Sequence, residues 1–164
     1  MALYQSLHCD VFAPRIGTGN PLAVILQADA LSTEQMQAIA DWMNLAETTF
    51  VLAPSVPEAD YRVRIFTTKK EIAFAGHPSI GTAHALLSQG LQPITAGVLM
   101  QQCQAGVLPI RYQPALTNNT LSVRVPSSKL VRFAQDDDAL LNGILPQSHW
   151  TDLKPALVEC VRRW

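Results

Sequence analysis

The segment Phe74-Ala75-Gly76-His77-Pro78-Ser79 constrains the fold most, because it joins a strand-like run to a helix that has no polar face. Pro78 suits the first turn of a helix, where an N–H group is not needed, and Gly90 is placed to end the helix. The residues between them are largely apolar or small on every side: Ile80, Gly81, Thr82, Ala83, Ala85, Leu86 and Leu87. A helix of this kind lies in the core of a larger structure. We therefore expect a buried central helix inside a curved sheet.

The start of this helix is also a candidate binding site. Gly76 lets the backbone approach a ligand closely, and the free N–H groups of the first turn carry partial positive charge that attracts a carboxylate. His77 lies directly beside them. Two structural alternatives stay open, namely a turn in which Gly76 serves the backbone alone, and a histidine that caps its own helix.

Short strands and one further helix account for the other elements. Ser32 and Gln35 predict a capping box at the start of that helix. Its buried face is predicted to comprise Met36, Ile39, Ala40 and Met43. Strands are expected at 7–12, 22–26, 48–52, 61–67, 98–104, 107–112 and 121–125, with 48–52 and 61–67 forming a pair. The predicted fold class is α+β, with a curved, mainly antiparallel, barrel-like sheet around the buried central helix.

Length and charge limit the number of domains and the kinds of partner. The 164 residues suffice for one domain with a sizeable core. The net charge of −1 gives no basic surface for nucleic acid or for an anionic membrane. The N-terminus lacks a basic segment followed by an apolar run, and no apolar stretch approaches the roughly 20 residues needed to span a bilayer. We expect a cytoplasmic protein without a nucleic-acid or membrane partner.

The cysteines and histidines do not form a metal-binding pattern. Cys9, Cys103 and Cys160 are odd in number and far apart, which argues against a disulfide framework and for a reducing compartment. His77 and His84 are about two helical turns apart, roughly 10 Å, which is too far to share one ion. We predict no metal site.

Five segments in order resemble the phenazine biosynthesis PhzF-like family over about residues 8–126. They are 10–12 with 19–24, 34–40, 43–51, 61–67 and 74–84. The resemblance implies a fold like that of diaminopimelate epimerase, in which two similar halves each form a barrel-like sheet around a central helix. The active site of such a fold lies in the cleft between the halves. The helix after Gly76 would then be the one inside the first barrel.

The resemblance implies a cofactor-independent isomerase that shifts a proton on a small carboxylated substrate. Glu47 matches the acid/base glutamate of the family, whereas a glutamate between a helix and a strand is otherwise expected to be an exposed loop residue. Gly76 and His77 would bind a carboxylate or carbonyl of the substrate and stabilise the charge that develops on it. Asn20 would help to fix that arrangement.

Neither a pair of thiols nor Glu71 is expected to act in catalysis. Enzymes of the diaminopimelate epimerase type use a pair of thiols, but no cysteine stands near Gly76, so a two-thiol racemase is not expected. Glu71 lies in the strand that leads to Gly76, and we interpret it as a structural residue paired with Lys69 or Lys70.

The chain departs from the family in its length, because PhzF-like proteins are nearly twice as long. We expect a PhzF-like N-terminal domain over 1–128, a helix and linker over 129–155, and the truncated start of a second domain over 156–164. Two functions of different class stay open. One is an isomerase with an incomplete active site, and the other is a non-catalytic binding or assembly module that retains only the N-terminal half.

Low charge and the missing half together predict self-association. Charged residues make up 15% of the chain, compared with about 25% in an average protein. The face that carries Glu47, Gly76 and His77 would be apolar and uncovered, and such faces rarely stay bare. We expect a homodimer, in which a second copy docks about a two-fold axis.

Overall fold

The computed structural model describes residues 3–113, 120–125, 129–133 and 156–159, and the chain divides into two units, Met1–Arg124 and Val125–Trp164. The second unit contains the antiparallel pair β9 (Lys129–Phe133) and β10 (Ala156–Glu159). Strand β9 occupies the start of the segment for which a helix and linker are predicted. The helix expected after Asp136 lies outside the described residues.

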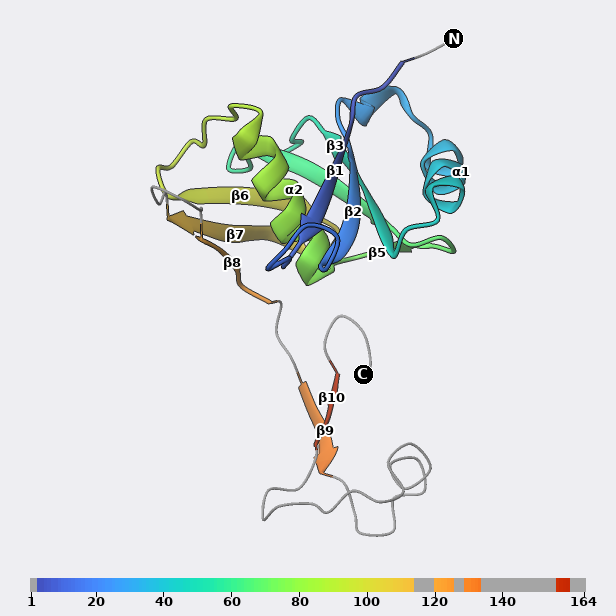
Figure 1. The fold of residues 1–164 in the computed structure, drawn as a ribbon. Helices are drawn as coiled ribbons and strands as arrows, with labels where there is room; N and C mark the ends of the chain where they lie inside the picture. The colour runs from blue at the N-terminus through green and yellow to red at the C-terminus, as the bar shows by residue number, and fades with distance from the viewer. Residues whose placement is uncertain (1–2, 114–119, 126–128, 134–155, 160–164) are drawn as a thin grey trace. The chain divides into compact units, whose positions relative to one another are not determined.

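The first unit contains one sheet of eight strands (Figure 1). The strands are β1 (Ser6–Val11), β2 (Asn20–Ile25), β3 (Glu47–Leu52), β4 (Tyr61–Phe66), β5 (Glu71–Ile72), β6 (Val98–Cys103), β7 (Gly106–Gln113) and β8 (Thr120–Val123). Their order is β1-β2-β3-β4-β6-β7-β8, and β5 pairs with β4. The pairs β2–β3 and β4–β6 are parallel and the others antiparallel, so the sheet is mixed and mainly antiparallel. All the predicted strands are present, and the predicted pair is β3–β4.

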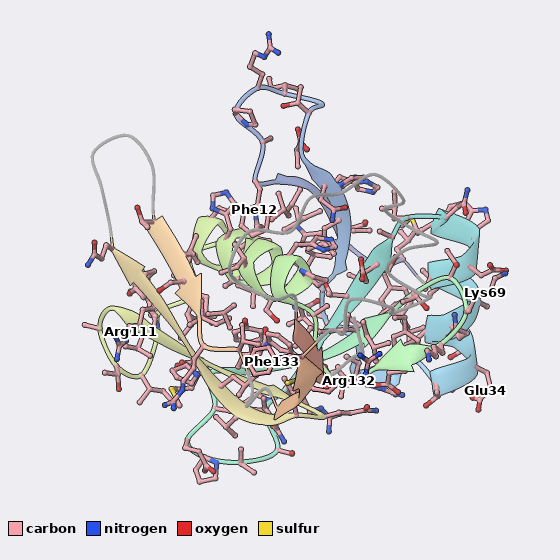
Figure 2. The ribbon with its side chains drawn as sticks, turned by 90° about the horizontal axis from the view of Figure 1, so that it is seen from below. Phe12, Glu34, Lys69, Arg111, Arg132 and Phe133 are labelled. Atoms are coloured by element: carbon pink, nitrogen blue, oxygen red, sulfur yellow. The ribbon has the colours of Figure 1, made fainter. Side chains whose placement is uncertain are left out.

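Helix α1 (Thr33–Met43) covers one face of the sheet. Ser32 forms the predicted capping box with Gln35, and a 3₁₀ turn, η1 (Ala28–Ala30), precedes it. Its buried face packs against the aromatic pair Phe50 and Phe66, whose ring centroids lie 5.4 Å apart. The predicted apolar face is confirmed: Met36 and Ala40 are buried and Ile39 and Met43 partly buried. Polar side chains such as Glu34 and Lys69 lie on the outer side of this layer (Figure 2).

Helix α2 (Gly76–Ser88) packs against the opposite face and contacts β1, β2, β3 and β8. Side chains of a strand point alternately to its two faces. In β3, Val51 accordingly joins the α2 cluster, while Phe50 and Leu52 join the α1 cluster. The strands between the helices are visible in Figure 1. As predicted, Gly90 follows the helix end, with a φ of +87°.

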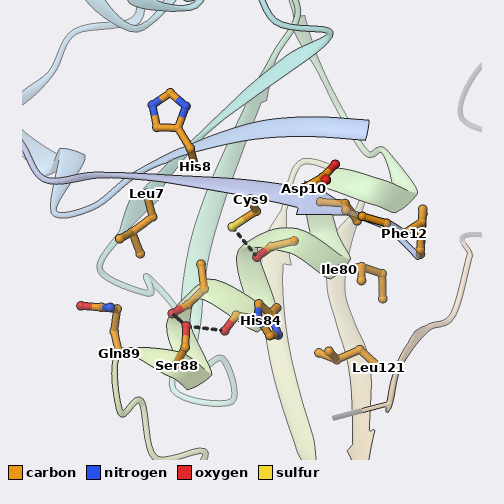
Figure 3. Close-up of a pocket in the computed structure, with 14 residues that line it drawn as sticks. Leu7, His8, Cys9, Asp10, Phe12, Ile80, His84, Ser88, Gln89 and Leu121 are labelled. Carbon is orange, nitrogen blue, oxygen red and sulfur yellow. Dashed lines mark hydrogen bonds between the residues drawn. The ribbon is translucent and has the colours of Figure 1, made fainter. Parts of the chain in front are cut away.

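The sheet is a curled half-barrel that leaves one side of α2 open. A pocket of about 630 Å³ runs along the helix between β1 and β8, with His84 and Leu121 in its lining (Figure 3). His84 and Ser88 are exposed. The expectation of a helix buried on all sides is therefore not confirmed, because β1 and β8 are the two ends of the strand order and do not pair with each other. In the described part of the chain, no helix is long and apolar enough to cross a membrane.

Candidate active site

The four predicted site residues belong to elements that begin at one end of the sheet. Asn20 is the first residue of β2, Glu47 the first of β3 and Gly76 the first of α2. Strands β2 and β3 are parallel, with Leu22 opposite Glu47, so both enter the sheet at the same end. His77, the second residue of α2, contacts both Asn20 and Glu47.

Glu47 and His77 form a buried pair of ionisable groups. The Nε2 atom of His77 lies 3.6 Å from Oε2 of Glu47, and the two side chains are 11% and 10% exposed. Burial lowers the pKa of His77, and the nearby Glu47 carboxylate opposes this shift. The lowered pKa favours a neutral imidazole beside Glu47 at neutral pH.

Asn20 determines which nitrogen of His77 carries the proton. The side-chain Nδ2 of Asn20 lies 3.1 Å from Nδ1 of His77. Because an amide nitrogen only donates, Nδ1 accepts, and the proton of the neutral ring is then on Nε2. That N–H faces Glu47, is buried, and has no hydrogen-bond partner among the described residues. A polar group of this kind is suited to receive a ligand atom.

The first turn of α2 is accessible to a ligand. Its N-cap residue, Ala75, makes no side-chain capping bond, and a Cβ atom built on Gly76 would meet nothing within 4 Å. The His77 ring bonds Asn20, so the alternative that this histidine caps its own helix is wrong. Within the described residues, no three His, Cys, Asp or Glu side chains are grouped to hold a metal ion.

Asp10 supports the loop that leads to Asn20. Its two carboxylate oxygens accept hydrogen bonds from the backbone N–H groups of Gly17 and Gly19, at 2.6 and 2.9 Å. A Cβ atom on Gly19 would collide with the Val11 carbonyl and with Asp10. Asp10 lies in one of the segments that resemble the PhzF-like family, but no role was predicted for it. Its partners are backbone groups, which no side-chain pattern reveals.

Glu71 is a structural residue, as interpreted, but its predicted partner is wrong. It binds Arg64 in a two-pronged ion pair, with N···O distances of 2.7 and 2.8 Å. Lys69 instead lies 4.0 Å from Asp41. The strand register explains the choice, because β4 and β5 pair antiparallel and bring Arg64 beside Glu71, whereas Lys69 stands in the turn between them.

Comparison with known proteins identifies relatives along most of the chain. The family described as "Phenazine biosynthesis-like protein" matches residues 9–164. Antisense-enhancing sequence 1 of Schizosaccharomyces pombe is 40% identical over 159 residues, which cover 94% of this chain and 54% of that protein. The trans-2,3-dihydro-3-hydroxyanthranilate isomerase of Pseudomonas aeruginosa is 53% identical over 84 residues, which cover 51% of this chain and 30% of the enzyme.

A solved structure supports the same relationship. The PhzF-family phenazine biosynthesis protein of Bacillus anthracis superposes with a TM-score of 0.72 and is 33% identical, over 84% of this chain and 45% of that protein. The chain thus spans about half the length of the Schizosaccharomyces pombe and Bacillus anthracis relatives. Several of the relatives that this chain matches are named isomerases. Because the family match extends over nearly the whole sequence, this chain belongs to the phenazine biosynthesis-like protein family.

Proposed function

We propose that this protein is a cofactor-independent isomerase that moves a proton, and with it a double bond, on a small carboxylated substrate. The observation that supports this most strongly is the buried Glu47–His77 pair at the start of α2. A carboxylate beside a neutral imidazole N–H combines a base with a hydrogen-bond donor. The first turn of α2 adds partial positive charge next to them.

The proposed reaction uses Glu47 as both base and acid. Its carboxylate takes a proton from a substrate carbon, and the electron pair left behind delocalises towards the substrate's carboxylate or carbonyl oxygen. The Nε2–H group of His77 and the backbone N–H groups at Gly76 stabilise the negative charge on that oxygen. The proton on Glu47 exchanges with solvent, and the Glu47 carboxyl group then donates a proton to a neighbouring carbon of the same system. The Glu47 carboxylate is thereby regenerated.

The relatives suggest the substrate class. The Pseudomonas aeruginosa relative is named for trans-2,3-dihydro-3-hydroxyanthranilate, a carboxylated ring. We therefore propose a dihydro-hydroxyanthranilate-type substrate, with its carboxylate towards the first turn of α2. Because the chain spans about half of its relatives, we also propose that residues 1–128 supply one wall of the active site and that this site is incomplete without a second wall.

A second copy of the chain is our proposal for that second wall. Two large apolar side chains in the loop between β1 and β2 are exposed, Phe12 by 71% and Ile16 fully. The pocket beside α2 adds an open surface next to Phe12. We propose a cytoplasmic homodimer. Light scattering at micromolar concentration should give the mass of two chains, and a monomer would reject the dimer.

Substrate consumption tests the proposed function. The purified protein is incubated with trans-2,3-dihydro-3-hydroxyanthranilate, and the remaining substrate is followed by liquid chromatography. We expect multiple turnovers with the wild type and with Glu58→Gln, a matched change at an exposed glutamate, and loss of turnover in Glu47→Gln. Binding without any turnover by the wild type would reject the isomerase and favour a non-catalytic binding module.

A further inference from the structure

A continuous line of buried polar side chains connects the sheet to the first turn of α2. The Tyr61 hydroxyl donates to Oε1 of Gln101 at 3.1 Å, and Nε2 of Gln101 donates to the Ser79 hydroxyl at 3.0 Å. Ser79 in turn donates to the carbonyl of Ala75 at 2.8 Å. Tyr61 is 3% exposed, and Gln101 and Ser79 are fully buried.

The chemistry of these groups determines which one donates and which one accepts in each hydrogen bond. Burial raises the pKa of Tyr61, so its phenol stays protonated and donates. Gln101 must therefore present its oxygen to Tyr61 and its amide N–H to Ser79. The single hydroxyl proton of Ser79 is left for Ala75. Each donor in the line is paired with an acceptor on the next residue, so one arrangement of the four residues is favoured over all others.

The two ends of the line are placed differently in the fold. Tyr61 on β4 and Gln101 on β6 are directly opposite each other in a parallel strand pair, within the sheet. Ala75 is the N-cap of α2 and stands two residues before His77. The line thus anchors the first turn of the helix, which carries the candidate site, to the centre of the sheet.

A second polar contact holds the next turn of the same helix. The hydroxyl groups of Thr82 and Thr49 lie 2.9 Å apart, and both residues are fully buried. Thr49 stands two residues after Glu47 on β3. Ser79 and Thr82 are three residues apart and so lie on neighbouring positions of one helix face. Helix α2 is therefore fixed by hydrogen bonds both to the strand that carries Glu47 and to β6.

We propose that Gln101 is a positioning residue, which holds the first turn of α2 so that His77 meets Glu47 and Asn20. This inference rests on the proposed function for its kinetic consequence. A buried amide is costly in an apolar core, where an apolar side chain of similar size would pack equally well. Apolar packing is non-directional, whereas this hydrogen bond specifies where the helix start lies.

The double variant Tyr61→Phe/Gln101→Met tests the proposal. It removes both partners together, which leaves Ser79 bonded to Ala75 and avoids an orphaned phenol, so we expect the protein to fold. Gln102→Met is the matched control, because Gln102 is the next residue on β6 and its side chain bonds Ser55 instead of α2. Tyr61→Phe alone, which removes the terminal donor, serves as a milder second variant.

Two readouts are measured for each variant. In an NMR titration, the pKa of His77 should rise towards about 6.5 in the double variant, because the ring is no longer held in its buried position. The kcat should fall roughly 10- to 100-fold with little change in KM, since a displacement of about 1 Å can cost about 100-fold. Tyr61→Phe should move both values in the same direction by less, and Gln102→Met should move neither.

A folded double variant with an unchanged His77 titration and unchanged kcat would overturn the positioning role. The titration does not depend on turnover. A shift of the His77 pKa in the double variant, together with full activity of Glu47→Gln, would therefore support the positioning role while rejecting the proposed function.

Discussion

The pKa of His77 depends on its burial and on its pairing with Glu47. Burial and the carboxylate act on the imidazole in opposite directions, and burial has the larger effect. The folded protein therefore binds a proton at His77 less readily than the unfolded chain does. Between the lowered folded pKa and the unfolded value of about 6.5, the unfolded state binds more protons. The contribution of His77 thus reduces the free energy of unfolding as the pH falls through this window.

Removal of the carboxylate charge should lower the pKa of His77 further. In Glu47→Gln the charge that raises this pKa is gone, while the burial that lowers it is retained. An NMR titration of the His77 ring should show a lower midpoint than in the wild type. Glu58→Gln should leave the midpoint unchanged. A midpoint that rises in Glu47→Gln would show that the Glu47 carboxylate does not raise the pKa of His77.

A substitution at Gly76 can distinguish a role in the backbone turn from a role in ligand binding. Its Cβ position is open, so Gly76→Ala should fold normally, with an unfolding midpoint equal to or slightly above that of the wild type. The added methyl group would occupy the space through which a ligand approaches the first turn of α2. We expect kcat/KM to fall at least about 10-fold, a loss of about 1.4 kcal/mol of transition-state stabilisation. Full activity in the alanine variant would leave Gly76 with a backbone role alone.

At the scale of elements, the close packing of α2 on β1 and β2 depends on Gly81. An added Cβ atom would lie 2.6 Å from Leu22 Cδ2 and 2.7 Å from Val11 Cγ2, and both side chains are buried. Overpacking costs about 1–3 kcal/mol, and the better helix propensity of alanine offsets up to about 1 kcal/mol. Chemical denaturation should therefore show Gly81→Ala to be less stable than the wild type, by up to about 2 kcal/mol. A stabilised variant would mean that the helix shifts freely against these strands.

Local signals explain why most elements were predicted. Ser32 and Gln35 specify the start of α1 through contacts three residues apart, and alternation in β4 separates the two faces of a strand. Long-range contacts explain what was missed. The hydrogen bonds of Gln101 join residues 22 and 40 positions apart, and nothing local in the sequence distinguishes this buried glutamine from the solvent-facing Gln113.

The candidate site residues also divide into those predicted from local sequence and those that depend on long-range contacts. A glycine, a histidine and a proline at a helix start indicated Gly76 and His77 from local chemistry alone. Glu47 was predicted only through the family resemblance, because its burial depends on where β3 enters the sheet. The role of Asn20 as the donor to His77 required the structure, since the two residues are 57 positions apart.

At the scale of the whole molecule, the candidate site lies at the end of a half-barrel whose relatives are about twice as long. Asn20, Glu47 and His77 are brought together within Met1–Arg124, so the groups proposed to transfer the proton belong to one unit. In the proposed reaction, Glu47 exchanges a proton with a carbon atom of the substrate. Such an exchange leaves a trace in the substrate, so a measurement on the substrate tests the role of Glu47 more directly than any property of the protein.

That measurement is the incorporation of solvent deuterium. The proposed substrate is incubated in D₂O with the wild type, with Glu47→Gln and with Glu58→Gln, and the recovered substrate and product are analysed by mass spectrometry. We predict a mass increase of one deuterium with the wild type and with Glu58→Gln, and no increase above the enzyme-free background with Glu47→Gln. Equal incorporation by the wild type and Glu47→Gln would contradict the assignment of Glu47 as the acid/base.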